Sequence, residues 1–143
     1  MDTERFYRAV YYAGSGWNFL ASVPTFFLVG ILPAMLQIDP PLYPIFIYFN
    51  LMTMFLFGCI QFTVARNLST SRPYVKILIW SKLLTVGIFM GGFFLLSIPR
   101  GLIEFLAPGM FLDLIFGILF WCSLRVISPT ISDLPVAEAA APH

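Results

Sequence analysis

Long uncharged runs dominate the pattern of hydrophobic and polar positions along the chain. No charged residue occurs in residues 9–38 or 40–65, and residues 77–99 and 101–124 together hold only three. Each run is at least as long as the roughly 20 residues that a helix needs to cross a bilayer. The pattern predicts an all-α integral membrane protein whose four transmembrane helices pack as an antiparallel bundle.

The composition supports this prediction. Hydrophobic residues make up 59% of the chain and charged residues 10%, whereas a typical soluble domain has about 25% charged residues. The net charge is +1, and the only histidine is the last residue, His143. We therefore expect the lipid bilayer as the main partner, no nucleic-acid partner and no metal site.

Turn signals divide the chain further. The first helix can extend back to Phe6, and Pro24 and Pro33 should kink it or end it early. We expect a four-helix transmembrane domain over residues 1–126 and a disordered, Pro/Ala-rich cytoplasmic tail over residues 127–143. The predicted spans are 17–36, 45–65, 77–98 and 102–124.

The basic residues predict the orientation in the membrane. The loops after the first and the third predicted spans contain one basic residue, Arg100. Because basic residues are enriched on the cytoplasmic side, both termini should face the cytoplasm, in the inner membrane of a bacterial cell. Six of the eight Lys and Arg residues lie in the N-terminal segment, in the loop after the second span and at the start of the tail: Arg5, Arg8, Arg66, Arg72, Lys76 and Arg125.

Four polar residues inside the predicted spans are candidates for a site. Asn18, Gln61 and Lys82 should lie at a similar depth in the cytoplasmic half, with Lys82 about level with residue 118. Asp113 should lie more than one turn deeper, on the order of 7 Å along the helix axis. Because unpaired charges in hydrocarbon cost several kcal/mol, we expect the four residues to form a satisfied polar layer.

Three interpretations of the two charges stay open. Lys82 and Asp113 form a structural pair that sets the register of the helices, or they line a ligand or proton site. In the third interpretation, Lys82 snorkels to the membrane interface and burial keeps Asp113 protonated.

Glycines mark two helix faces. Gly109 and Gly117 lie four residues before and after Asp113, so a neighbouring helix can approach that face closely. Gly87 and Gly91 lie roughly 140–180° around the third span from Lys82. If Lys82 faces the interior, this small-residue face points outward and predicts contact with a transmembrane helix of another subunit or of a second copy.

Scattered residues of the chain resemble a known group of proteins. They are Asn18 and Pro24, the tripeptide VAR at 64–66, the stretch RPYV that leads to Lys82, and Asp113 followed by Phe116 and Phe120. Over residues 5–125 the chain resembles small, uncharacterised bacterial four-span proteins that are distantly similar to DoxX-like membrane proteins. That group has glycine immediately before the lysine, where this chain has Ser81. The resemblance implies a four-helix bundle with Lys82 and Asp113 as noteworthy residues, and it implies no activity.

The expected function follows from what the spans contain. They show no catalytic constellation and no cofactor motif, although a lipid, a quinone or a carotenoid would suit their many aromatic side chains. The leading hypothesis is a small non-catalytic accessory subunit of a larger bacterial membrane complex, respiratory or photosynthetic. The alternative is a binder or carrier of a lipophilic small molecule such as a quinone, through the polar layer. An enzyme is the third hypothesis.

Overall fold

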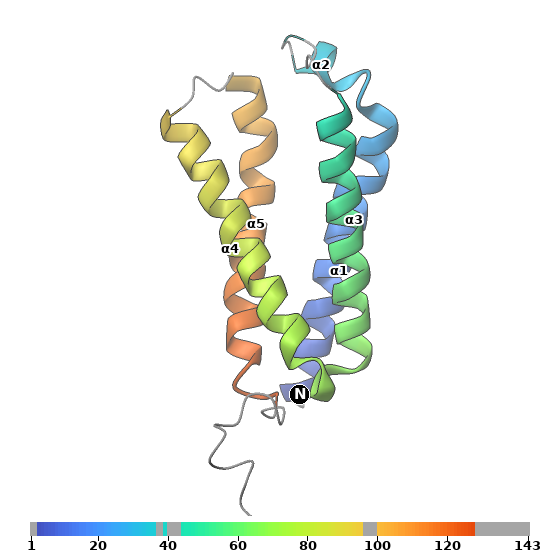
Figure 1. Cartoon of the computed structure of the whole chain (residues 1–143), viewed down its shortest axis with the longest axis vertical. Coiled ribbons are helices and arrows are strands. Elements are labelled where there is room, and N and C mark those ends of the chain that lie inside the picture. The colour runs from blue at the N-terminus through green and yellow to red at the C-terminus, as the bar shows by residue number, and fades with distance from the viewer. Residues whose placement is uncertain (1–2, 37–38, 40–43, 96–99, 128–143) are drawn as a thin grey trace, which may run out of the picture.

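The structure is a computed structural model of the chain that describes residues 3–36, 39, 44–95 and 100–127. In these residues all regular secondary structure is helical, as the sequence predicts. The described part of the chain forms five α-helices and one short 3₁₀ helix, η1 (Figure 1): α1 Thr3–Leu28, α2 Leu32–Met35, α3 Ile45–Arg66, η1 Leu68–Thr70, α4 Arg72–Leu95 and α5 Arg100–Ser123.

Three of these helices are long and apolar enough to cross a membrane, namely α3, α4 and the Gly101–Ser123 part of α5. They coincide with the second, third and fourth predicted spans, so the chain has the helices of a multi-pass membrane protein. Among the described residues, α1 is the long helix that is not in this group. It begins with charged residues and carries a buried polar face that includes Ser15 and Asn18. A fourth span through α1 stays a prediction.

The first helix differs from the predicted span 17–36 at both ends. α1 begins at Thr3 and ends at Leu28. Glu4 lies in its first turn and pairs with Arg8 one turn later, with 2.7 Å between Oε1 and Nη2. An acidic residue at a helix start and an ion pair at this spacing both stabilise a helix, which accounts for the early beginning.

Prolines mark the other differences in helix bounds. Pro24 lies inside α1, whereas Pro33 lies in the first turn of α2. The backbone N–H groups of a first turn have no partner within the helix, so the missing N–H of proline costs no hydrogen bond there. Pro73 is likewise in the first turn of α4, so that this helix begins at Arg72 and not at residue 77. The predicted end of that span at residue 98 lies outside the described residues. So does the predicted tail 127–143 except for Ile127, which is buried in the hydrophobic cluster and is therefore not part of a disordered tail.

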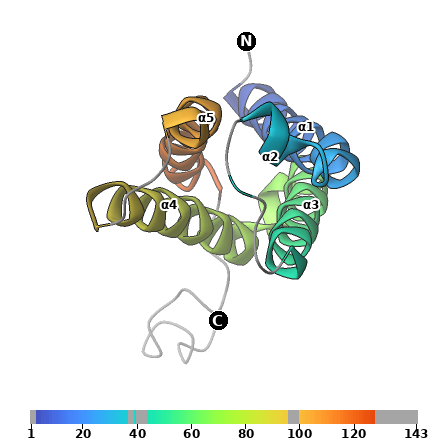
Figure 2. The ribbon, with the colours of Figure 1, turned by 90° about the horizontal axis from the view of Figure 1, so that it is seen from above.

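The four long helices form two antiparallel hairpins, α1 with α3 and α4 with α5. Figure 1 shows the hairpins together at the end where α1 begins and apart at the end where α2 lies. We call these ends the core end and the α2 end. Seen from above, α1, α3, α4 and α5 follow one another around the bundle (Figure 2). At the α2 end the hairpins touch again, since a Cβ added to Gly101 would lie 2.7 Å from the carbonyl oxygen of Leu36.

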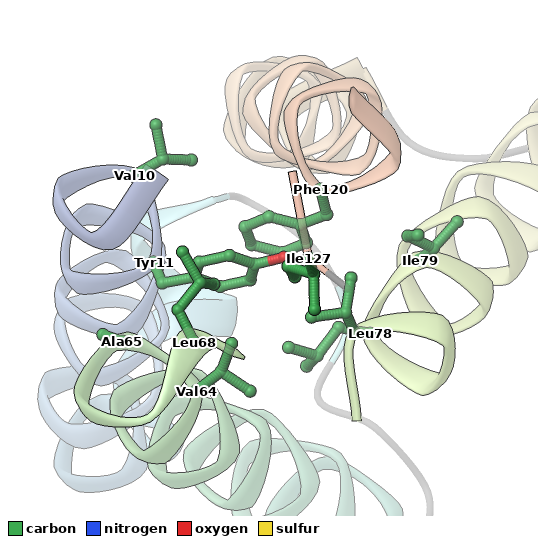
Figure 3. Close-up of a cluster of buried hydrophobic side chains, with 10 residues drawn as sticks. Val10, Tyr11, Val64, Ala65, Leu68, Leu78, Ile79, Phe120 and Ile127 are labelled. Atoms are coloured by element: carbon green, nitrogen blue, oxygen red, sulfur yellow. The ribbon is translucent and has the colours of Figure 1, made fainter. Parts of the chain in front are cut away.

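The core end holds the cluster of buried hydrophobic side chains, to which all four long helices contribute. Figure 3 shows Tyr11 of α1 and Phe120 of α5 side by side at its centre. Their rings are stacked with centroids 4.5 Å apart, and the hydroxyl oxygens of Tyr11 and Ser123 share a hydrogen bond of 2.7 Å. The other members of the cluster are Val10, Val64, Ala65, Leu68, Val75, Leu78, Ile79 and Ile127.

Toward the α2 end the rest of the chain covers the second hairpin only in part. No residue of α4 from Leu83 to Leu95 is buried, and none of α5 from Gly101 to Phe116 is. Lys82 and Gly117, which are buried, therefore mark the level at which the two hairpins part. Beyond that level, lipid or another molecule must cover the apolar faces of α4 and α5.

Candidate functional site

Lys82 of α4 connects three helices at the level where the hairpins part. Its ammonium group forms an ion pair with Oδ1 of Asp113 on α5 and donates a hydrogen bond of 3.3 Å to Oδ1 of Asn18 on α1. The side chains of Lys82 and Asp113 are 7% and 14% exposed. The two charges are therefore nearly shielded from the surroundings and have the partners that buried charges require.

The backbone levels of the two charged residues agree with the sequence prediction. A Cβ added to Gly117 would lie 3.4 Å from Cβ of Lys82, so Lys82 starts level with Gly117. Asp113 lies one turn before Gly117 on α5, and the methylene groups of the Lys82 side chain extend over this distance to reach it. Because the ammonium group lies inside the bundle, the interpretation in which Lys82 snorkels to the interface is wrong. A structural pair and a ligand or proton site both stay open.

Asn18 presents an unused amide group to the interior. Asn18 is 2% exposed. A lysine ammonium group only donates hydrogen bonds, so the carbonyl oxygen of Asn18 must face Lys82. The amide nitrogen, Nδ2, is buried and has no hydrogen-bond partner in the part of the chain that the structure describes. Asn18 thus retains a free donor group inside the bundle.

Gln61 of α3 lies beside this network without joining it. It is 0% exposed, and neither its Nε2 nor its Oε1 has a partner among the described residues. Its Oε1 lies against α1, because a Cβ added to Gly14 would be 2.8 Å away. Gly14 precedes Asn18 by one turn on the same helix face, so the two carboxamides are about one turn apart. The predicted polar layer thus consists of Lys82, Asp113 and Asn18 as a bonded group, with Gln61 next to it. The expectation that the whole layer is satisfied is wrong, since among the described residues Gln61 and the Nδ2 atom of Asn18 have no partner.

Two glycines outside the predicted helix-packing set bring α1 and α3 together at this level. The first is Gly14, which faces Gln61 as described above. The second is Gly58, where an added Cβ would lie 2.7 Å from the Phe19 ring and 3.3 Å from Cβ of Asn18. Ser15 Oγ also donates a hydrogen bond of 2.9 Å to the carbonyl oxygen of Gly58. The sequence signal for them is spacing, because each lies one turn from a buried carboxamide residue on its own helix.

The predicted glycines occupy different environments. Gly117 faces the Lys82 stem, and a Cβ on Gly109 would meet the Trp17 ring at an ordinary 3.6 Å. Gly87 and Gly91 have no atom within 4 Å of an added Cβ. These two glycines take no part in the polar network, and in the chain by itself their side of α4 has room for a neighbour.

The buried polar face of α1 extends further toward the N-terminus than Asn18. Tyr11, Ser15, Asn18 and Ser22 recur every three or four residues and are all buried. Ser22 Oγ donates a hydrogen bond of 2.6 Å to the carbonyl oxygen of Asn18. The hydroxyl groups of this face are hydrogen-bonded, so its unpartnered polar atom, among the described residues, is Nδ2 of Asn18.

Two apolar grooves lie close to these residues. The larger one, about 460 Å³, runs between α1 and α3 toward the α2 end and is lined by Ser22, Phe26, Tyr48, Leu51 and Phe55 among others. Its nearest lining residue, Ser22, is one turn from Asn18. The smaller one, about 200 Å³, lies between α4 and α5 and includes Gly117, which faces Lys82. Neither groove is lined by the four polar residues themselves.

The fold and the site together define the class of the protein, an all-helical, multi-pass membrane protein with a buried ion pair inside its second hairpin, linked to the first hairpin by the hydrogen bond from Lys82 to Asn18. Among the described residues, no group of three or more His, Cys, Asp or Glu side chains could hold a metal ion. In comparisons with known proteins, no family model, no curated protein and no solved structure matches this chain. The resemblance to DoxX-like membrane proteins stays a prediction.

Proposed function

We propose that the chain is an integral membrane protein that binds a lipophilic small molecule, whose polar head lies at Asn18 and Gln61 beside the Lys82–Asp113 pair. The observation that carries the proposal is a set of three buried polar atoms that have no partner among the described residues, Asn18 Nδ2, Gln61 Nε2 and Gln61 Oε1. Leaving a buried donor or acceptor unpaired costs about 1–3 kcal/mol. A site with three such atoms therefore favours a guest that pairs with them.

The α1–α3 groove suits the apolar part of such a guest. Its volume of about 460 Å³ falls within the range of roughly 300–1,000 Å³ that is usual for small-molecule sites. Its lining is apolar and rich in aromatic rings, and it starts one turn from Asn18. A molecule with a polar head and an apolar chain, as a quinone or an acyl lipid has, matches the combination of site and groove.

The proposal includes the membrane arrangement expected from the sequence. α1 is the fourth span, next to the three helices that are apolar and long enough to cross a bilayer. The basic residues at the core end support a cytoplasmic location for both termini, in a bacterial inner membrane. With this arrangement the polar network lies in the cytoplasmic half of the membrane.

Replacing Asn18 and Gln61 together by leucine should remove the bound molecule. We expect a lipophile to accompany the purified wild-type protein in a fixed ratio and to fall at least about tenfold in the double variant, because its polar head loses its partners. Mass spectrometry of the lipophiles extracted from protein purified in a mild detergent measures this ratio.

The control for this experiment is Thr63→Val. Thr63 is exposed on the same helix as Gln61, and its hydroxyl donates a hydrogen bond to the carbonyl oxygen of Cys59, one turn earlier. This variant should retain the lipophile. The proposal is wrong if the double leucine variant, still helical by circular dichroism, contains the same molecules in the same ratio as the wild type.

The second candidate function is that of a non-catalytic accessory subunit of a larger membrane complex. The observation that favours it is the open face at Gly87 and Gly91, where an added Cβ would meet no atom within 4 Å. Small residues let transmembrane helices approach closely, so this face suits another helix. We place this function second because lipid can cover the same face, whereas lipid chains cannot pair with the buried amides.

Replacing Gly91 by leucine tests the accessory role. The bulky side chain should break assembly with another subunit or a second copy while the bundle stays folded. Cross-linking in native membranes, followed by size analysis, reports the assembly. The matched control is Gly16→Leu, which adds the same side chain at a glycine of α1 that also has no atom near an added Cβ. If assembly survives Gly91→Leu, this face is not the interface.

A further inference from the structure

The free polar atoms of the candidate site define the head group that it can accept. We infer that the bound molecule has a neutral head with at least one hydrogen-bond donor and two acceptor positions, such as a primary amide, a protonated carboxyl group or a hydroxyl group, and this rests on the function proposed above. The inference depends on which atoms of Asn18 and Gln61 are already used and which are free.

Asn18 requires an acceptor on the guest. Its Oδ1 already accepts a hydrogen bond from Lys82, and its Nδ2 is the unpartnered atom. Since the lysine ammonium group cannot accept, the two ends of the Asn18 amide cannot be exchanged without losing that bond. The free group of Asn18 is therefore an N–H donor.

Gln61 requires both an acceptor and a donor on the guest. Both of its polar atoms are unpartnered and the residue is fully buried. Exchanging the two ends of its amide would leave the same pair of free groups, one donor and one acceptor. Together, Asn18 and Gln61 present two donor groups and one acceptor oxygen, and a complementary head accepts twice and donates once.

The charge balance of the site favours a neutral head. Lys82 and Asp113 carry opposite charges and are paired with each other. Asn18 and Gln61 are uncharged. An ionised head group would therefore bring an uncompensated charge into a nearly buried site, which is strongly unfavourable in a region of low dielectric.

These requirements separate classes of lipophile that a purely apolar groove would accept equally. A hydrocarbon carotenoid offers no polar atom. An ester or an oxidised quinone only accepts, and it would leave Gln61 Oε1 without a partner. A primary amide can donate one N–H to Oε1 while its carbonyl oxygen accepts from Gln61 Nε2 and Asn18 Nδ2.

Quenching of Trp17 fluorescence by brominated probes tests this inference. The Trp17 ring lies against Gly109 of α5, one turn from Asp113, and is thus next to the site. Trp80 and Trp121 are 71% and 58% exposed, and replacing both by phenylalanine leaves Trp17 as the only tryptophan. In this background, reconstituted in nanodiscs, the probes are 9,10-dibromostearamide and its N,N-dimethyl derivative, in which two methyl groups replace the amide N–H donors; the Gln61→Leu variant described below separates the loss of the donors from the added bulk.

We expect the primary amide to quench Trp17 at a concentration at least about tenfold lower than the dimethylamide, because the latter leaves Gln61 Oε1 unpaired. Gln61→Leu should abolish this difference, and the Thr63→Val control should retain it. Equal quenching by the two probes that disappears when Asn18 and Gln61 are both leucine would overturn the donor requirement and leave the proposed function standing. Quenching that is no stronger in the wild-type site than in that double variant would overturn both.

Discussion

Replacing Lys82 by methionine should lower the free energy of unfolding by about 3–5 kcal/mol, because it leaves the Asp113 carboxylate buried without its partner. Asp113 is 14% exposed at its side chain, and its ion pair with Lys82 joins α4 to α5. The same substitution removes the hydrogen bond between Lys82 and Asn18, which ties α4 to α1. Reversible unfolding in mixed micelles, followed by the loss of helical circular dichroism, measures the change.

The double variant Lys82→Met, Asp113→Leu is the control for this effect. Replacing both members of a buried ion pair by apolar residues of similar size is often neutral or stabilising. We therefore expect the double variant to recover most of the stability that Lys82→Met loses. A single variant as stable as the wild type, or a double variant as unstable as the single one, would contradict the buried pair.

The double variant also separates the two interpretations of the ion pair that remain open. If the pair only sets the register of the helices, the double variant should keep the bound lipophile. If the pair forms part of the ligand site, the double variant should be stable and should lose that molecule.

Replacing Gly58 by alanine should destabilise the α1–α3 hairpin by about 1–3 kcal/mol, the usual cost of an added group in a packed interior. The new Cβ would lie 2.7 and 2.9 Å from two carbons of the Phe19 ring and 3.3 Å from Cβ of Asn18. The Phe19 ring can rotate away, but Cβ of Asn18 moves only with the backbone of α1. We therefore expect α1 to shift and the bond from Lys82 to Asn18 to weaken. The same unfolding measurement reports the loss of stability.

Gly87→Ala is the matched control for Gly58→Ala. It makes the same change in a helix of similar length, at a glycine where an added Cβ meets no atom within 4 Å. Since alanine favours a helix over glycine by about 1 kcal/mol, this variant should be at least as stable as the wild type. Equal effects at the two glycines would show that Gly58 does not limit the approach of α1 and α3.

The level of Lys82 relative to Asp113 could be predicted from the sequence because the two residues lie on consecutive helices. When two antiparallel helices are joined by a short connection, counting residues from the connection gives the depth of each side chain. The contact between Gly117 and the Lys82 stem agrees with that count. Counting gives depth only, and it does not show whether a flexible lysine turns toward its partner or away from it.

The bond from Lys82 to Asn18 could not be predicted in the same way. The two residues are far apart in the chain, on α4 and α1, and their meeting depends on how the two hairpins are placed side by side. That placement is set by packing at the core end, where Tyr11 stacks on Phe120. The sequence identified Asn18 and Gln61 as buried polar residues, but it did not separate the bonded one from its unbonded neighbour.

By itself the sequence determined the helical class, the three apolar helices that can cross a membrane and the residues that would be costly to bury alone. These properties follow from local composition and from helix periodicity, which each segment carries on its own. Only the tertiary structure decided that Lys82 bonds to Asn18, that Gly14 and Gly58 bring α1 and α3 together, and that three amide atoms stay without a partner among the described residues. Such features depend on which side chains of distant segments fill the same space, and no local pattern specifies that.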